Sequence, residues 1–154
     1  MLMVGTHVAH NAKLGSNNVI ANCTQIAGHV ELGDYITIGG NSAIHQKVRV
    51  GSHSMLSGLS ATNHDLPPYF TYGGIPSRIL GFNKYGLDKR GFSKESINEI
   101  SRAFKLIRRN QELTNQQLID LFKSELQDFE EIREIINFMS QSGRGVKFYP
   151  KVSA

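Results

Sequence analysis

The chain has 154 residues, of which 40% are hydrophobic and 19% charged, and its formal net charge is +4. This is the composition of a globular domain, and no apolar tract is long enough to cross a bilayer, so we expect no membrane insertion. The single cysteine, Cys23, excludes an internal disulfide and agrees with a reducing compartment, the cytoplasm. Its position inside a repeat predicts a packed thiol rather than a nucleophile.

Residues 8–56 follow a period of six. Every sixth residue is a branched aliphatic, and most of the residues that follow them are small; the series reads Val8, Leu14, Ile20, Ile26, Leu32, Ile38, Ile44, Val50 and Leu56. A period of six fits neither a helix nor a flat strand. It is the hexapeptide pattern of a parallel β-helix, in which short strands wind round a three-sided prism and equivalent positions stack from coil to coil. We therefore predict that the aliphatic side chains fill the prism.

The pattern predicts β-helix coils and an exit strand over residues 1–74, with the exit strand at Phe70-Thr71-Tyr72. The repeat starts in mid-register with no polar or helical cap, so we expect either a longer solenoid or a partner that covers the first coil. Residues 75–92 are expected to form a basic connecting segment.

Residues 93–154 are predicted to form a small helical domain. Ser93 is a candidate N-cap for a helix that runs to about Arg109. Thr114-Asn115-Gln116-Gln117 is a capping box for a second helix. Asp128 with Glu131 is expected to start a third helix that stops before Gly143, and residues 144–154 are expected to form a loose basic tail.

The positive charge is concentrated in residues 78–109, which hold nine basic and three acidic side chains. A local charge of +6 suggests an anionic partner. Nucleic acid is disfavoured because the segment lacks a recognised nucleic-acid fold and an aromatic stacking motif. A phosphate-bearing small molecule or an acidic carrier protein fits the charge as well.

All six histidines lie between His7 and His64, where the repeat places them in corner or outward columns. Outward imidazoles beside a subunit groove can act as acid, base or ligand. We favour a plain surface role for His53 and His64 and a functional one for the remaining four, His7, His10, His29 and His45. The intervals between those four along the chain do not single out a zinc triad, so no metal is expected.

Several motifs in chain order resemble one family. They are His7-Val8-Ala9-His10-Asn11, Ala27-Gly28-His29-Val30, Gly39-Gly40-Asn41-Ser42-Ala43-Ile44-His45-Gln46, Asp65-Leu66-Pro67-Pro68-Tyr69 and Gly86-Leu87-Asp88-Lys89-Arg90-Gly91-Phe92-Ser93. The series is similar to the acyl-carrier-protein–UDP-N-acetylglucosamine O-acyltransferases, and the similarity covers nearly the whole chain. The resemblance implies a left-handed β-helix, a homotrimer with active sites between subunits, and several further N-terminal coils.

The resemblance also implies an activity: transfer of an (R)-3-hydroxyacyl chain from acyl carrier protein to the 3-hydroxyl of UDP-N-acetylglucosamine, the first step of lipid A synthesis. The donor is the carrier's phosphopantetheine thioester, and no bound cofactor is implied. By this resemblance His10 is the general base and Gly28 the oxyanion donor. The other implied residues bind substrate: His7, His29, His45 and Gln46 line the groove, Gly58 sets the acyl length, and Asn83, Lys89 and Arg90 hold uridine and phosphate.

Two positions differ from the family motif. Asn11 stands where the family has an aspartate that orients the catalytic imidazole, and Lys89 replaces the first arginine of an Arg-Arg pair, where lysine cannot form a bidentate fork. Asn11 and the shorter chain leave two alternatives open. One is a silent solenoid that assembles with a full-length paralogue, and the other is a related N-acyltransferase acting on an O-acylated sugar nucleotide.

Overall fold

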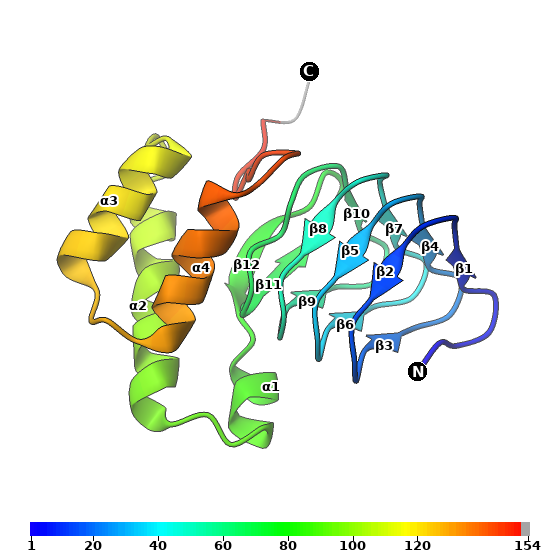
Figure 1. The fold of residues 1–154 in the computed structure, drawn as a ribbon, viewed down its shortest axis with the longest axis horizontal. Coiled ribbons are helices and arrows are strands. Elements are labelled where there is room, and N and C mark those ends of the chain that lie inside the picture. Colours follow the sequence, from blue (N-terminus) through cyan, green and yellow to red (C-terminus); the bar gives the residue numbers. More distant parts are fainter. Residues whose placement is uncertain (152–154) are drawn as a thin grey trace.

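The computed structural model describes residues 1–151 and shows a parallel β-helix followed by helices that pack at its end (Figure 1). Short strands of two residues each form the three faces of the prism: β1 (His7–Val8), β2 (Lys13–Leu14), β3 (Val19–Ile20), β4 (Gln25–Ile26), β5 (Glu31–Leu32), β6 (Thr37–Ile38), β7 (Ala43–Ile44), β8 (Arg49–Val50), β9 (Met55–Leu56) and β10 (Ala61–Thr62). They stack in the orders β1-β4-β7-β10, β2-β5-β8 and β3-β6-β9. The predicted β-helix is confirmed.

Each strand pairs in parallel with the equivalent strand of the next coil, as His7 with Gln25 and Gln25 with Ala43. Because one coil is three hexapeptides long, the aliphatic positions stay stacked from coil to coil. The aliphatic series from Ile20 to Leu56 is buried, as predicted, whereas in the first coil Val8 is only half-buried and Leu14 is exposed. The apolar column holds the prism together, and the outward positions remain available for chemistry.

The corners of the prism share one backbone conformation. Nine residues at six-residue intervals have φ between 55° and 63°: Asn11, Asn17, Cys23, His29, Tyr35, Asn41, Lys47, His53 and Leu59. This left-handed conformation suits asparagine, which occupies three of the nine positions. All nine are exposed except His53, which is half-buried. The prediction of a packed Cys23 thiol was therefore wrong, because this cysteine lies on an exposed corner.

Two residues before each aliphatic position the repeat has a small or β-branched residue, and Asn18 is the exception. Its buried amide donates to the carbonyl oxygens of Gly15 and Gly33, and its Oδ1 accepts from the Ile36 N–H. The side chain thus links two coils by pairing with backbone groups of both, including the buried Ile36 N–H.

The solenoid ends in β11 (Phe70–Gly73), which pairs in parallel with β9 and confirms the predicted exit strand. Its antiparallel partner is β12 (Arg78–Phe82), and the short helix α1 (Lys84–Lys89) follows. Residues 75–92, expected as a connection, therefore contain a strand and a helix. Their regular structure fixes Asn83 and Arg90 at the two ends of α1.

The helical domain consists of α2 (Lys94–Arg109), α3 (Asn115–Glu125) and α4 (Glu130–Ser140). The Ser93 N-cap and the Thr114 capping box are confirmed. The predicted start of the third helix was wrong, because Phe129 is its N-cap and the Asp128 carboxylate instead pairs with Arg133. No helix in residues 1–151 is long and apolar enough to span a membrane.

The segment after α4 turns back to the solenoid. Val146 and Phe148 are buried, Val146 forms a bridge to Asp65, and the Phe148 carbonyl accepts from the Ile79 N–H. The prediction of a loose tail was wrong for these residues, because their apolar side chains pack into the junction. The last three residues of the predicted tail lie outside the described part of the chain.

Candidate functional site

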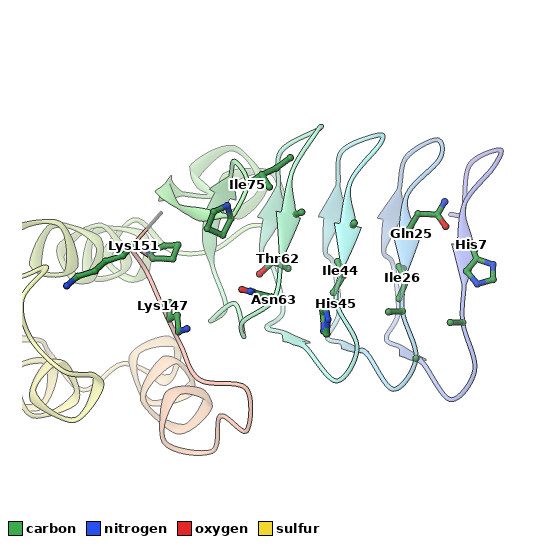
Figure 2. A pocket seen from close by; sticks show the side chains of 17 residues that line it. His7, Gln25, Ile26, Ile44, His45, Thr62, Asn63, Ile75, Lys147 and Lys151 are labelled. Atoms are coloured by element: carbon green, nitrogen blue, oxygen red, sulfur yellow. The ribbon is translucent and has the colours of Figure 1, made fainter. Parts of the chain in front are cut away.

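A groove of about 890 Å³ runs along the face formed by β1, β4, β7 and β10 (Figure 2). Small side chains make its floor: Ala9, Ala27, Ala43 and Ala61. His7 lies at the end nearest β1, His45 lies further along, and Lys147 and Lys151 lie toward the helical domain. A flat apolar floor with imidazole and ammonium groups around it suits a ligand that combines a hydrocarbon part with an anionic part.

His10 lies against the backbone of Gly28, one of the residues that line the groove. A Cβ at Gly28 would stand 2.8 Å from both Cε1 and Nε2 of the imidazole, so no side chain fits there without displacing the ring. The His29 ring meets His10 edge to face, with 5.1 Å between centroids. In residues 1–151 the Gly28 N–H donates to no protein acceptor. A base and a backbone donor without a protein acceptor therefore lie side by side at the groove.

Asn11 follows His10 at an exposed corner with φ of 58°. Among the described residues, its side chain forms no hydrogen bond to the imidazole. The corner conformation alone is a sufficient reason for asparagine at this position. An orienting role for Asn11 remains a prediction.

His45 is held from outside the repeat. Its Nδ1 lies 3.1 Å from a guanidinium nitrogen of Arg144, in the loop after α4. Gln46 is exposed beside it and does not line the groove.

A second cluster occupies a corner of the prism near α1. The His53 ring is stacked between the rings of Tyr35 and Tyr69, at centroid distances of 5.1 and 5.7 Å, and Phe92 meets it edge to face at 4.9 Å. Burial, followed by the nearby Arg90 charge, lowers the pKa of His53. The aromatic corner and the nearby guanidinium therefore disfavour the charged form of His53.

Asn83 and Arg90 lie beside this aromatic corner. The Asn83 amide donates to the His53 carbonyl oxygen at 2.9 Å, and its Oδ1 accepts from the Gly86 N–H, so the side chain caps α1. The Arg90 guanidinium lies 5.3 Å from the Tyr35 ring centroid, and its Nη1 is buried with no partner in the described residues. Burial lowers the pKa of Arg90. An incompletely paired guanidinium is suited to an anionic ligand.

The predicted site residues therefore fall into two places. His7, Gly28 and His45 line the groove, and His10 and His29 lie beside Gly28. The predicted residues that neither line it nor contact Gly28 are Asn11, Gln46, Gly58, Asn83, Lys89 and Arg90. Lys89 is exposed and lies 5.6 Å from the Tyr85 ring centroid. Gly58 is exposed at the corner after β9, where a Cβ would stand 3.3 Å from the Gly40 carbonyl oxygen.

His64, like the half-buried His53, is not the surface histidine expected from the sequence. Only 1% of its surface is exposed, and its Nδ1 lies 3.1 Å from Asn63 Oδ1. Burial, with a smaller effect of the Lys147 charge, lowers the pKa of His64 to about 4. Within residues 1–151 no group of three or more His, Cys, Asp or Glu side chains could hold a metal ion.

Sequence reasoning missed the aromatic corner and Arg144. Tyr35 and His53 occupy equivalent positions in successive coils, so the repeat itself could have placed them in contact. Tyr69 and Phe92 lie beyond the repeat, and Arg144 lies in the presumed loose tail, where no periodicity indicates a neighbour.

Three comparisons with known proteins agree. A family model described as UDP N-acetylglucosamine O-acyltransferase, domain 2, matches residues 65–147, more than half of the chain. The acyl-[acyl-carrier-protein]–UDP-N-acetylglucosamine O-acyltransferase of Burkholderia thailandensis is 35% identical over 148 residues, which cover 94% of this chain and 56% of that protein. The chain thus spans little more than half the length of the curated relatives it matches.

Solved structures of such enzymes are similar in fold. The UDP-N-acetylglucosamine acyltransferase LpxA of Bacteroides fragilis has a TM-score of 0.88 and 34% identity, covering 92% of this chain and 55% of that one. LpxA of Acinetobacter baumannii has a TM-score of 0.86 and 39% identity, with the same shares covered. The similarity includes both the solenoid and the helices.

Proposed function

The chain belongs to the UDP-N-acetylglucosamine O-acyltransferase family, and on this basis we propose that it transfers an (R)-3-hydroxyacyl chain from acyl carrier protein to the 3-hydroxyl of UDP-N-acetylglucosamine, in lipid A biosynthesis. One observation supports this activity above the others. The His10 imidazole lies against Gly28 beside an open apolar groove, and the Gly28 N–H has no protein acceptor in the described chain. Acyl transfer to an alcohol requires such a base and such a donor.

In the proposed reaction, His10 removes the proton of the sugar 3-hydroxyl as its oxygen attacks the thioester carbonyl. The Gly28 N–H donates to the oxyanion that forms. As the tetrahedral intermediate collapses, the carbon–sulfur bond breaks and the imidazolium returns its proton to the departing phosphopantetheine thiolate. General base catalysis of this kind is typically worth about 10²–10⁴-fold in rate.

The charge distribution fits an acidic donor protein. Residues 78–109, which carry the local charge of +6, contain β12, α1 and α2. Exposed basic side chains lie along α2: Lys94, Arg102, Lys105, Arg108 and Arg109. Acyl carrier protein is the acidic partner we propose for this surface. The carrier's phosphopantetheine then supplies the acyl group as substrate, and the reaction as written needs no bound cofactor.

A second copy of the chain would complete the site. Asn83 and Arg90, which we propose for uridine and phosphate, do not line the groove that holds His45. In a cyclic homotrimer each groove faces the neighbouring protomer, so one chain supplies the base and the next supplies the nucleotide contacts. We propose this arrangement for the present chain, in the cytoplasm where its donor is made.

The test is turnover by the purified chain with (R)-3-hydroxyacyl carrier protein and UDP-N-acetylglucosamine, followed by release of the carrier's thiol. We expect His10→Ala to lower kcat by about 10²-fold or more while the chain stays folded, because the imidazole is exposed and lies outside the buried apolar core. Turnover that survives this substitution would remove the proposed mechanism.

A second candidate role is a silent solenoid subunit that assembles with a longer relative. Two observations motivate this role. Asn11 places no charge beside the His10 imidazole, and the match covers only 56% of the length of the Burkholderia thailandensis relative. A folded chain without turnover that binds a full-length relative would favour this role. Turnover only with an O-acylated sugar nucleotide as acceptor would instead favour an N-acyltransferase.

A further inference from the structure

The loop after α4 is fixed to the solenoid by Asp65. This aspartate is 1% exposed, and its Oδ2 accepts from the Ser142 hydroxyl at 2.6 Å and from the Arg144 N–H at 3.4 Å. Its own N–H donates to the Gly145 carbonyl oxygen at 2.9 Å, and its Oδ1 accepts from the Arg49 N–H at 2.8 Å. A buried carboxylate with these partners holds the loop at the end of the groove.

The anchored loop directs the Arg144 side chain toward His45. The Arg144 Nε donates to the Asn63 carbonyl oxygen at 3.2 Å, and Nη2 lies 3.1 Å from His45 Nδ1. Figure 2 shows His45 and Asn63 close together along the groove. Two contacts, one to backbone and one to the imidazole, define where the guanidinium lies.

This contact decides which imidazole nitrogen carries the proton. A guanidinium has only donors and keeps its charge, so His45 Nδ1 must accept through its lone pair. Nδ1 also lies 3.4 Å from the Gln46 carbonyl oxygen, a contact that would require a proton on Nδ1. The two contacts exclude each other, and the shorter, charge-assisted one is the stronger. With this contact Nδ1 keeps its lone pair, and the ring proton is on Nε2.

We propose that Arg144 is a positioning residue that fixes His45 as a neutral Nε2–H donor in the groove. Arg144 itself does not line the groove, so it acts on the ligand through His45. The Nε2–H would donate to an acceptor oxygen of the sugar nucleotide. This inference rests on the proposed function for its ligand, but the state of the imidazole does not depend on it.

The first test measures the imidazole without substrate, by ¹⁵N NMR of the full chain with labelled histidine, assigned with His45→Gln. We expect neutral His45 protonated on Nε2 in the wild type near pH 7.5. In Arg144→Ala, Nδ1 should gain the proton and donate to the Gln46 carbonyl, so the Nδ1–H tautomer appears. Arg144→Gln, which keeps an N–H donor, should retain the wild-type tautomer. An Nδ1–H or charged His45 in the wild type, or an unchanged tautomer in Arg144→Ala, would overturn the proposal.

The second test is kinetic. Loss of one hydrogen bond of about 1 kcal/mol predicts that Arg144→Ala raises the KM for the sugar nucleotide about fivefold, with a smaller change in kcat. Arg144→Gln should recover most of this loss. Arg133→Ala is the matched control, because Arg133 is an exposed arginine on α4 that pairs with Asp128. An equal KM increase in the control would contradict a role through His45.

The two tests separate the two proposals. A tautomer change in an inactive chain would support the positioning role and count against the proposed function. Normal turnover with an unchanged KM in Arg144→Ala would support the function and overturn the positioning role.

Discussion

Replacing Gly28 by alanine tests the geometry of the proposed site most closely, because it preserves every functional group. The new Cβ would stand 2.8 Å from both Cε1 and Nε2 of His10, whereas ordinary carbon contacts begin near 3.4 Å. The imidazole must therefore retreat by roughly 0.6 Å, the difference between these two distances, or rotate away from the groove. Misplacement by about 1 Å can cost about 10²-fold in rate, so we expect kcat/KM for acyl transfer to fall about 10²-fold.

The fold should tolerate the substitution. The His10 ring is exposed and can turn into solvent, and the φ of Gly28 lies outside the left-handed region, so alanine can adopt it. Alanine also reduces the entropy of the unfolded chain, typically by about 0.4–1 kcal/mol in favour of folding. We therefore expect the free energy of unfolding to change by less than about 1 kcal/mol.

Gly40→Ala is the matched control. Gly40 also precedes a left-handed corner residue, but the nearest atom to its Cβ would be the Asn22 carbonyl oxygen, at 3.2 Å, and no imidazole is close. Its kcat/KM should stay within about twofold of wild type. Thiol-release kinetics and thermal melting of both variants make the comparison. A Gly28→Ala chain as active as Gly40→Ala would refute the assignment of His10 as the base held at this glycine.

Three further predictions follow from other parts of the chain. Asn11→Asp should raise kcat, because a carboxylate would stabilise the imidazolium formed on His10; equal rates across a pH series would contradict this. His64 stays neutral in the fold down to about pH 4 but protonates near 6.5 when unfolded, so stability should fall as the pH drops through this window, by up to about 3 kcal/mol. His64→Gln should show a shallower pH dependence in denaturant titrations, and an identical slope would show that His64 is not buried as a neutral base. Tyr69→Phe removes the hydroxyl that donates to Glu134, whose pKa is raised by burial, and should cost about 1–3 kcal/mol; a double-mutant cycle with Glu134→Ala that gives no coupling would refute the contact.

The repeat made most of the solenoid predictable because each position recurs in the same environment. The aliphatic column had to face inward, and each strand had to stack on its equivalent in the next coil, so the core from Ile20 to Leu56 followed directly. The caps of α2 and α3 were also predictable, because Ser93 and Thr114 act on backbone groups only three residues away.

Features that depend on distant contacts were not predictable. Phe129 caps α4 without a side-chain hydrogen bond, so the helix start left no sequence signal. The burial of His64 and Phe148 depends on the return of the C-terminal segment to the solenoid, and no local pattern encodes that return. The Arg144 contact with His45 joins residues 99 positions apart. Residues with possible chemical roles could be named from the motifs, but their division between a groove and a separate corner required the fold.

The proposed site combines His10 of one protomer, as the base, with Arg90 of the next, as a nucleotide contact. Its most direct test is activity of mixed trimers made by co-expressing His10→Ala and Arg90→Ala chains, each inactive alone. A site is intact only where the Arg90→Ala chain supplies His10 and the neighbouring His10→Ala chain supplies Arg90. With equal amounts of both chains mixed at random, each of these conditions is met about half of the time. About one quarter of wild-type turnover should therefore return. Mixed trimers with no more activity than either parent would contradict the account.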